Sequence, residues 1–303
     1  MRAQALKLVE ACAAHDLSPA IAFVRLLVLC GDAATARSAL NRLAADAERR
    51  RELGPALAEL RNLLDSGGDL VARILAHERR LNEPSAAADE LTRCARLFDQ
   101  ALRESPEASV ALYSLGSPAR LEAATAEVVA LLEHLGVLGA ERRILEIGCG
   151  IGRFQQALAS RARALVGIDI APGMIAEARR RCADLPNVML ARTSGRDLAA
   201  FRAAAFDAVL AIDSLPYVHR AGMALLEVHV REAARVLREG GDFVVLNLTY
   251  RGDLELDRQD AGRLGALSGL ELLRGGTRDL ELWDGATFHL RKPKAGAAGV
   301  ALS

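Results

Sequence analysis

Hydrophobic residues recur every three or four positions from Ala3 to about Gly136, and this spacing predicts one helix after another. The pair Ser18-Pro19 has the form of an N-cap followed by proline in the first helical turn. The pair Gly31-Asp32 predicts the end of one helix and the cap of the next, and Ser66-Gly67-Gly68-Asp69 predicts a second break of the same kind. We therefore expect an all-α N-terminal region.

Later breaks in this helical region predict its internal boundaries. Asn82–Ser85 interrupts the pattern ahead of a long helix from Ala86 to about Glu104, and Ser117-Pro118 begins the last helix of the region. We therefore expect an N-terminal helical domain over residues 1–82 and a helical linker over residues 83–138. Residues 139–303 form the third expected domain.

The pattern changes after Gly139, where short apolar runs alternate with amphipathic helices. The expected strands are Arg143–Ile147, Ala164–Ile168, Val188–Ala191, Phe206–Ile212 and Asp242–Leu248, and the expected helices are Gly152–Arg161, Gly173–Cys182 and Gly222–Arg238. Apolar strands that alternate with helices indicate an α/β fold with a parallel sheet covered on both faces. Two last runs, Leu270–Leu273 and Ala286–Leu290, predict a closing pair of strands.

Composition and charge narrow the classes of protein that fit this pattern. The 303 residues are 51% hydrophobic, and 39 basic residues balance 39 acidic ones, so the strongly basic footprint of a nucleic-acid-binding protein is missing. The first helix is amphipathic, unlike a signal peptide, and the apolar stretch Ala20–Cys30 is too short to span a bilayer. Five scattered cysteines without CxxC pairing indicate reduced thiols, no metal site and no disulfide framework. We expect a cytoplasmic protein without a nucleic-acid or membrane partner.

A glycine-rich turn joins the first expected strand of the sheet to its helix, in the sequence Leu145-Glu146-Ile147-Gly148-Cys149-Gly150-Ile151-Gly152. Glycine permits a sharp turn and lets a ligand approach the backbone closely. The second expected strand ends at Asp169, where a carboxylate can accept two hydrogen bonds from a ribose diol. The alternative is a tight turn alone, with Asp169 capping the next helix. The GxGxG spacing differs from the GxGxxG of dinucleotide-binding proteins and disfavours a nicotinamide-dependent oxidoreductase.

Residues from about Gly139 to Lys292 resemble the class I S-adenosylmethionine-dependent methyltransferases. The resemblance rests on the blocks LEIGCGIGRF, GIDIAPGMIAEAR, FDAVLAIDSLPYV and ARVLREGGDFVVLNL. It implies a Rossmann-like, mostly parallel seven-stranded sheet with helices on both faces and an antiparallel last strand. It also implies S-adenosyl-L-methionine as cofactor, residues 139–303 as the domain that binds it, and residues 83–138 as a lid over the active site.

The resemblance assigns cofactor contacts residue by residue. In the glycine turn these are Glu146, Gly148, Cys149, Gly150 and Gly152, with Glu146 organising the loop or lying near the amino group. Asp169 would hold the ribose hydroxyls, while Ile170 and Met174 would pack on the adenine. The other expected contacts are Gly195, Arg196 and Asp197 after the third strand, Asp213 and Ser214 after the fourth, and Tyr113 in the lid. A buried core tyrosine is the alternative for Tyr113.

Catalytic candidates follow the fourth and fifth expected strands. Methyl transfer from a sulfonium is an in-line displacement, so the protein chiefly aligns the nucleophile and the methyl group. A general base helps when the acceptor carries a proton, and the candidates are Tyr217, His219 and Tyr250. His219 titrates nearest neutral pH as a residue type, and a solvated loop histidine is its alternative. Asp253 either binds a polar acceptor or caps the next helix.

We therefore expect a methyltransferase that acts on an O, N or C nucleophile of a small metabolite or natural-product intermediate. The fourth strand ends in Asp213–Tyr217 without the Asn/Asp-Pro-Pro-Tyr/Phe signature, which disfavours a base or glutamine acceptor. Methylation of a peptide or protein side chain remains an alternative, as does a cofactor-binding regulatory protein without turnover. The N-terminal helices are a candidate surface for homodimerisation.

Overall fold

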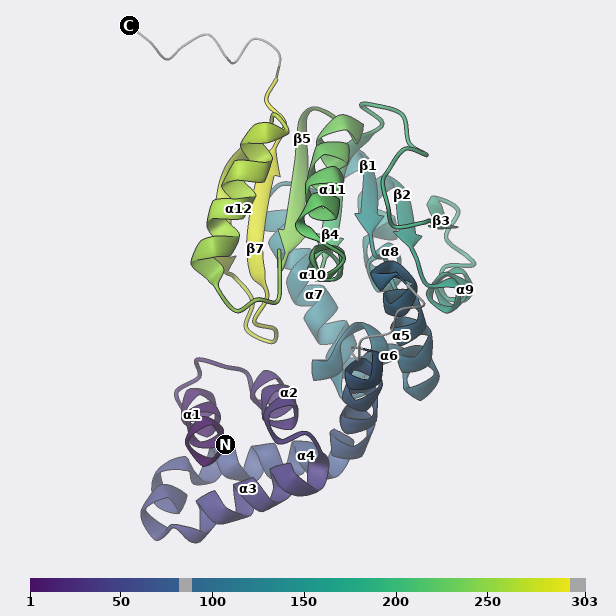
Figure 1. Ribbon diagram of the computed structural model, residues 1–303. Helices are drawn as coiled ribbons and strands as arrows, with labels where there is room; N and C mark the ends of the chain where they lie inside the picture. Colours follow the sequence, from purple (N-terminus) through teal and green to yellow (C-terminus); the bar gives the residue numbers. More distant parts are fainter. Residues whose placement is uncertain (82–88, 295–303) are drawn as a thin grey trace, which may run out of the picture. The chain divides into compact units, whose positions relative to one another are not determined.

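The computed structural model describes residues 1–81 and 89–294, and their contacts divide the chain into two compact units (Figure 1). Among the described residues, the helical unit contains residues 1–81, 97–127 and 280–284. The sheet unit contains residues 89–96, 128–279 and 285–294. The expected domain boundaries at residues 82/83 and 138/139 stay predictions, and the expected break at Asn82–Ser85 lies outside the described residues.

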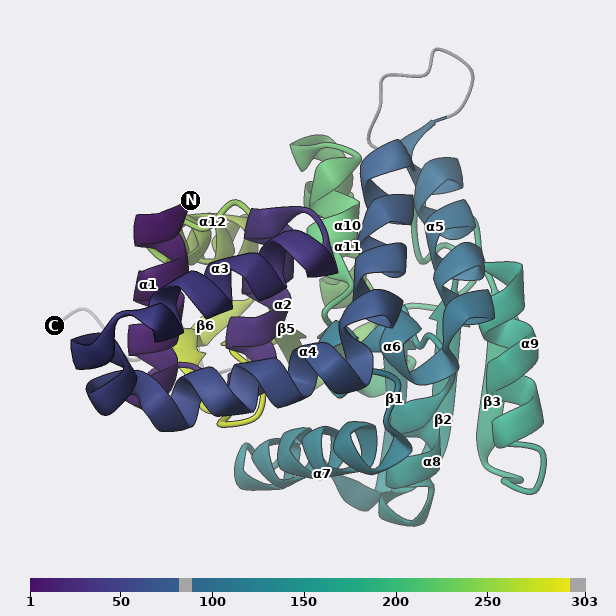
Figure 2. The same ribbon diagram turned by 90° about the horizontal axis from the view of Figure 1, so that it is seen from below.

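The helical unit is all-α, as the spacing of its hydrophobic residues predicts. Its helices are α1 (Arg2–Ala13), α2 (Pro19–Cys30), α3 (Ala33–Ala45), α4 (Ala47–Leu81) and α6 (Pro106–Val110), with the short turn η1 (Leu112–Ser114). Helices α5 (Glu90–Glu104) and α7 (Pro118–His134) are divided between the units. Figure 2 shows α1, α2 and α3 packed against α4. Among the described residues no single helix is long and apolar enough to cross a membrane; α2 and α3 together, bent by 110°, meet that requirement by length and composition only.

Three of the helix breaks expected in this unit are confirmed and one is wrong. The first of the three is Ser117-Pro118, since α7 begins at Pro118. Ser18 caps α2 and Asp32 caps α3, since each side chain accepts the N–H of the residue three positions on, at 3.3 and 2.7 Å. At Ser66–Asp69 the expected break is wrong, because α4 continues through it. A Cβ atom at Gly67 would lie 2.8 Å from Leu115 Cβ, so this glycine permits close packing inside a helix instead of a turn.

The sheet unit is built on seven strands. They are β1 (Gly139–Ile147), β2 (Ala162–Asp169), β3 (Val188–Arg192), β4 (Phe206–Ile212), β5 (Leu237–Leu246), β6 (Glu271–Arg278) and β7 (Ala286–Arg291). Their order is β3-β2-β1-β4-β5-β7-β6. Strands β1 to β5 pair in parallel, and β7 runs antiparallel to both of its neighbours. The expected Rossmann-like sheet with an antiparallel last strand is confirmed.

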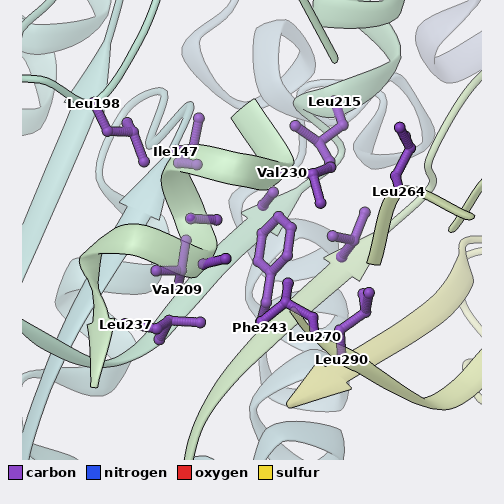
Figure 3. Packing of buried hydrophobic residues seen from close by; sticks show 14 of the residues in the cluster. Ile147, Leu198, Val209, Leu215, Val230, Leu237, Phe243, Leu264, Leu270 and Leu290 are labelled. Atoms are coloured by element: carbon purple, nitrogen blue, oxygen red, sulfur yellow. The ribbon is translucent and has the colours of Figure 1, made fainter. Parts of the chain in front are cut away.

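The helices of the sheet unit bury its central strands. They are α8 (Arg153–Leu158), η2 (Ala159–Arg161), α9 (Pro172–Arg181), α10 (Leu215–Arg220), α11 (Met223–Val236) and α12 (Leu254–Leu267). Every residue of β4 is buried. Figure 3 shows the core on one face, where Val209 and Phe243 of the strands meet Val230 of α11 and Leu264 of α12. This core fixes the carboxyl ends of the parallel strands at one edge, which is where open α/β sheets bind ligands.

Candidate cofactor and acceptor site

The glycine turn after β1 adopts a backbone that favours glycine. Its φ angles are 78° at Gly148, 52° at Gly150 and 78° at Gly152. A Cβ atom at Gly148 would lie 2.5 Å from Ser214 Cβ, at the end of β4. Ser214 Oγ is buried and has no hydrogen-bond partner among the described residues. The Gly148 backbone and the unsatisfied Ser214 hydroxyl therefore lie together where the cofactor's reactive end is expected.

Asp169 lies at the carboxyl end of β2 and holds the loops on either side. Its Oδ2 accepts the Gly150 N–H at 3.0 Å, and its Oδ1 accepts the Ala171 N–H at 2.9 Å. A carboxylate has about four lone-pair positions, so these bonds are compatible with further donors such as hydroxyl groups. The carboxylate thus joins the β1 turn to the start of α9, and its expected contact with ribose stays a prediction.

Glu146 is a buried acid at the end of β1, 3% exposed. Its Oε2 accepts the Gln155 Nε2–H at 2.6 Å, while Gln155 Oε1 is buried without a partner among the described residues. Burial raises the pKa of Glu146 to about 7, with a smaller contribution from the negative charge of Asp169; the Gln155 bond and Arg153 oppose it. This side chain therefore changes charge near neutral pH in the free protein.

The expected adenine side joins the loop after β2 to the loop after β3. A Cβ atom at Gly195 would lie 2.5 Å from Ile170 Cγ2 and 3.6 Å from Leu91 Cδ2. Met174 is fully buried in α9, and its expected contact with the adenine stays a prediction. Asp197 Oδ1 accepts the backbone N–H two residues on, at 3.0 Å, and so holds its own loop. Leu91 comes from α5 and was missed from the sequence, because the spacing of its helix marks it only as a core residue.

The start of α5 is tied to a loop and to a helix of the sheet unit. Asp89 forms an ion pair with Arg196 after β3, and Glu90 Oε1 lies 3.1 Å from Arg220 Nη2 at the end of α10. The ends of β2 and β1 lie between β3 and β4 in the sheet order. The start of α5 therefore joins the loop after β3 to the end of α10, and we take it as a candidate cover for the strand ends that lie between them in the sheet.

The residues that directly follow β4 and β5 both have a left-handed backbone. Asp213 has φ 60° and Asn247 has φ 62°. Asn247 Nδ2 donates to Asp213 Oδ1 at 2.9 Å, and the Tyr250 hydroxyl donates to the same oxygen at 2.5 Å. Such conformations cost roughly 1–3 kcal/mol at non-glycine residues and gather at functional sites. This cluster is therefore the candidate acceptor side of the site.

Tyr217 and Tyr250, two of the expected catalytic residues, lie against each other. Their ring centroids are 5.7 Å apart, and the ring planes make an angle of 87°. Tyr250 is 51% exposed as a residue, and its hydroxyl is held by the hydrogen bond to Asp213. Burial of the hydroxyl, and then the negative charge of Asp213, raise the pKa of Tyr250 well above its usual value. Tyr250 therefore keeps its proton at neutral pH, and its expected role in catalysis stays a prediction.

The structure does not bring His219 into this cluster. It lies two positions after Tyr217 in α10, and residues two apart do not face the same way on a helix. Its role as a base stays a prediction. Asp253 caps α12, with Oδ1 accepting the Leu256 N–H at 3.0 Å, which is the second of its two alternatives.

Tyr113 belongs to the helical unit and is buried there. Its ring stacks on Trp283 with the centroids 6.0 Å and the planes 23° apart. This arrangement matches the alternative of a buried core tyrosine, and the lid contact stays a prediction. Within the sheet unit, the helical residue that lies next to the expected adenine side is Leu91, in the first turn of α5.

Comparison with known proteins finds similarity to methyltransferases over part of the chain. Residues 145–245 match the family model of the methyltransferase domain. Demethylmenaquinone methyltransferase of Tropheryma whipplei (strain Twist) is 35% identical over 121 residues, which are 40% of this chain and 47% of that protein. The S-adenosyl-L-methionine-dependent Diels-Alderase iccD of Talaromyces variabilis is 31% identical over 127 residues, 41% of this chain and 42% of that protein. The chain thus spans less than half the length of these two relatives.

A solved structure supports the fold independently of these sequence matches. Magnesium protoporphyrin IX methyltransferase from Synechocystis PCC 6803, with bound S-adenosylmethionine, has a TM-score of 0.50 at 16% identity. The match covers 69% of this chain and 100% of that one. At this identity the likeness is one of fold, and it extends beyond the matched domain.

Proposed function

We propose that this chain, which belongs to the class I S-adenosylmethionine-dependent methyltransferases, transfers a methyl group from that cofactor to a nucleophile of a small molecule. The observation that carries the proposal is the meeting of three strand ends at the glycine turn. Gly150 is held by Asp169 of β2, and Gly148 lies against Ser214 after β4. A dinucleotide-type GxGxxG turn is missing from this position.

The residues at this edge fit the cofactor part by part. Asp169 offers carboxylate oxygens to the ribose hydroxyls, and Ile170 with Leu91 offers apolar surface to the adenine. Ser214 Oγ, buried without a partner among the described residues, offers a hydrogen bond at the reactive end. When bound, the cofactor would supply a methyl group on a sulfonium, to whose carbon a nucleophile bonds in line as the thioether sulfur leaves. The first turn of α5 would exclude water from the bound cofactor, which strengthens electrostatic interactions in the site.

We propose a small-molecule acceptor for two reasons. The net charge is zero, which provides no general attraction for nucleic acid. Demethylmenaquinone, the acceptor named for the Tropheryma relative, is a small molecule. The alternatives are a peptide or protein acceptor and cofactor binding without turnover. Homodimerisation through α1–α4 and a cytoplasmic location, which five scattered cysteines without CxxC spacing favour, also stay proposals.

The proposal is tested with the full chain in two steps. Calorimetry measures the binding of S-adenosylhomocysteine, S-adenosylmethionine and NAD. The protein is then incubated with methyl-labelled S-adenosylmethionine and a metabolite extract, and label is sought in low-mass products. We expect micromolar binding of the first two ligands, no competition by NAD, and labelled small molecules. Binding of NAD alone refutes the cofactor assignment; label only in peptide fractions, or in none, supports one of the alternatives.

A further inference from the structure

We propose that Tyr250 and Asp213 form a proton relay that removes the proton of a ring hydroxyl on the acceptor, a phenol or an enol, and that Asn247 is the residue that positions Asp213. The inference rests on the proposed methyl transfer and adds the class of acceptor and the route of its proton. It is drawn from the hydrogen-bond chain that joins the ends of β4 and β5.

The main chain fixes the orientation of the Asn247 amide. Its backbone N–H donates to Ala286 O at 2.9 Å, and its Oδ1 accepts the Ala286 N–H at 3.0 Å. An amide oxygen that accepts this N–H leaves the Nδ2 group, a donor, directed at Asp213. Asp213 is held in turn by its own N–H, which donates to Leu246 O at 2.9 Å. Asn247 therefore fixes which oxygen of Asp213 receives the Tyr250 proton.

The titratable and charged groups around the relay come from three other elements. Helix α10 contributes Tyr217, and also Arg220, whose guanidinium lies 6.0 Å from the centre of the Tyr217 ring. Helix α5 contributes Glu90, which pairs with Arg220. In the segment after β5 and in α12, the ion pairs are Arg251 with Asp257 at 2.7 Å and Arg251 with Asp260 at 2.8 Å. These two arginines are thus bound to carboxylates of their own surroundings.

When a ring hydroxyl reacts, each proton and each electron pair has a defined destination. A lone pair of the acceptor oxygen forms the new O–CH3 bond, and the electron pair of the broken S–C bond stays on sulfur. The acceptor's proton moves to the Tyr250 oxygen while the Tyr250 proton moves to Asp213 Oδ1. The positive charge of the sulfonium and the negative charge of the carboxylate disappear together. Tyr250 is neutral before and after the step, in keeping with its resistance to ionisation.

The acceptor class follows from acidity and shape. A phenol loses its proton near pH 10 in water, whereas an alkyl alcohol is a far weaker acid and a poor partner for a carboxylate. The half-exposed ring of Tyr250, with the Tyr217 ring perpendicular to it, presents a flat apolar surface next to the relay hydroxyl. A flat ring that carries a hydroxyl matches both features.

A first test uses a readout other than turnover. The chain has three tyrosines, so the absorbance of tyrosinate during an alkaline titration resolves them. We expect one late-titrating tyrosine that is lost in Tyr250→Phe. In Asp213→Asn it should titrate about one pH unit or more earlier, because removal of a negative charge favours phenolate. An unchanged titration in Asp213→Asn would show that Asp213 does not hold this proton.

A second test uses catechol, 1,4-dihydroxynaphthalene and aniline as acceptors with labelled cofactor. We expect turnover of the two hydroxylated rings and a loss of about 10²- to 10⁴-fold in kcat for Tyr250→Phe, with unchanged affinity for S-adenosylhomocysteine. In Asn247→Asp a second carboxylate beside Asp213 raises the pKa of that pair, so the acid limb of kcat/KM should move to higher pH. The exposed Asp184→Asn is the control and should leave the profile in place.

The outcomes separate this inference from the proposed function. Failure to bind S-adenosylhomocysteine refutes the methyltransferase proposal itself. Binding without methylation of either hydroxylated ring, or methylation of aniline alone, overturns the acceptor class. Lower activity in Asn247→Asp without a shift of the acid limb overturns the positioning role, because a purely structural defect does not move a titration.

Discussion

Replacing Glu146 by glutamine tests the electrostatics beneath the glycine turn. The acid is 3% exposed, and burial raises its pKa from 4.5 to about 7. Glutamine keeps the shape of the side chain and cannot ionise. Its amide can also donate to Gln155 Oε1, which has no partner in the part of the chain that the structure describes. The variant therefore removes the cost of a buried charge without opening a cavity.

The sign and size of the effect follow from the two pKa values. Because the folded pKa is raised above the unfolded one, the folded state holds a proton between pH 4.5 and about 7 that the unfolded state has lost. This contribution to stability is fully present below about pH 4.5 and is lost as the pH rises through 7. A difference of about 2.5 pKa units, at 1.36 kcal/mol each, corresponds to roughly 3 kcal/mol as an upper bound. Glu146→Gln should therefore gain up to about 3 kcal/mol over wild type above pH 7, and little below pH 5.

Urea unfolding followed by circular dichroism at pH 5, 6, 7 and 8 measures this difference. Glu141→Gln is the control, because Glu141 is an exposed carboxyl on the same strand, β1. A gain in Glu146→Gln that does not grow with pH refutes the argument. Calorimetry in buffers of different ionisation enthalpy adds a second readout. If the cofactor's amino group lies near Glu146, binding at pH 7 should release about half a proton in wild type and none in the variant.

Four other substitutions test the site and the core. Asp169→Ala should weaken S-adenosylhomocysteine binding about ten- to a hundred-fold in calorimetry, since charge-assisted hydrogen bonds contribute roughly 1.5–3 kcal/mol each; unchanged affinity contradicts the ribose assignment. Leu91→Ala should raise the dissociation rate of the same ligand about tenfold in stopped flow if Leu91 covers the adenine, and an unchanged rate removes α5 from the site. In α12, Gly262→Ala should raise the free energy of unfolding by about 1 kcal/mol, because a Cβ there would meet nothing closer than 3.9 Å. Gly265→Ala should lower it by about 1–3 kcal/mol, because its Cβ would lie 2.6 Å from Leu290; equal effects contradict the packing.

The architecture of the sheet could be predicted because its central strands are apolar throughout. The expected strand Phe206–Ile212 has the bounds of β4, and burial on both faces explains its unbroken apolar run. The start of β5 could not be predicted in the same way, since Gly240-Gly241 has the composition of a turn. The strand in fact begins at Leu237, and Gly240 has φ 73° where the β4–β5 register shifts. Glycine in a strand marks a bulge as readily as a turn, and the two differ only in tertiary pairing.

The same limit applies to Gly67 of α4, where the glycine pair looked like a helix end. A glycine ends a helix when the chain needs a left-handed residue, as at Gly31 with φ 86°. It continues a helix when a neighbour comes too close for a Cβ atom, as Leu115 does at Gly67. Which of the two holds depends on a residue 48 positions away in sequence.

The residues of the candidate site are of two kinds, which differ in how well the sequence alone predicts them. Asp169, Asp213 and Asn247 each follow a buried apolar strand at its carboxyl end, so one rule applies to all three: the first polar side chain after such a strand faces the ligand edge. Asn247 was missed although this signal was present. Leu91 and Glu90 have no comparable signal, because an apolar and an acidic residue at the start of an amphipathic helix are ordinary there. They reach the site only because α5 crosses it, through ion pairs that join elements far apart in the chain. Strand-end chemistry can therefore be derived from sequence alone, whereas residues that a neighbouring helix contributes require the tertiary structure.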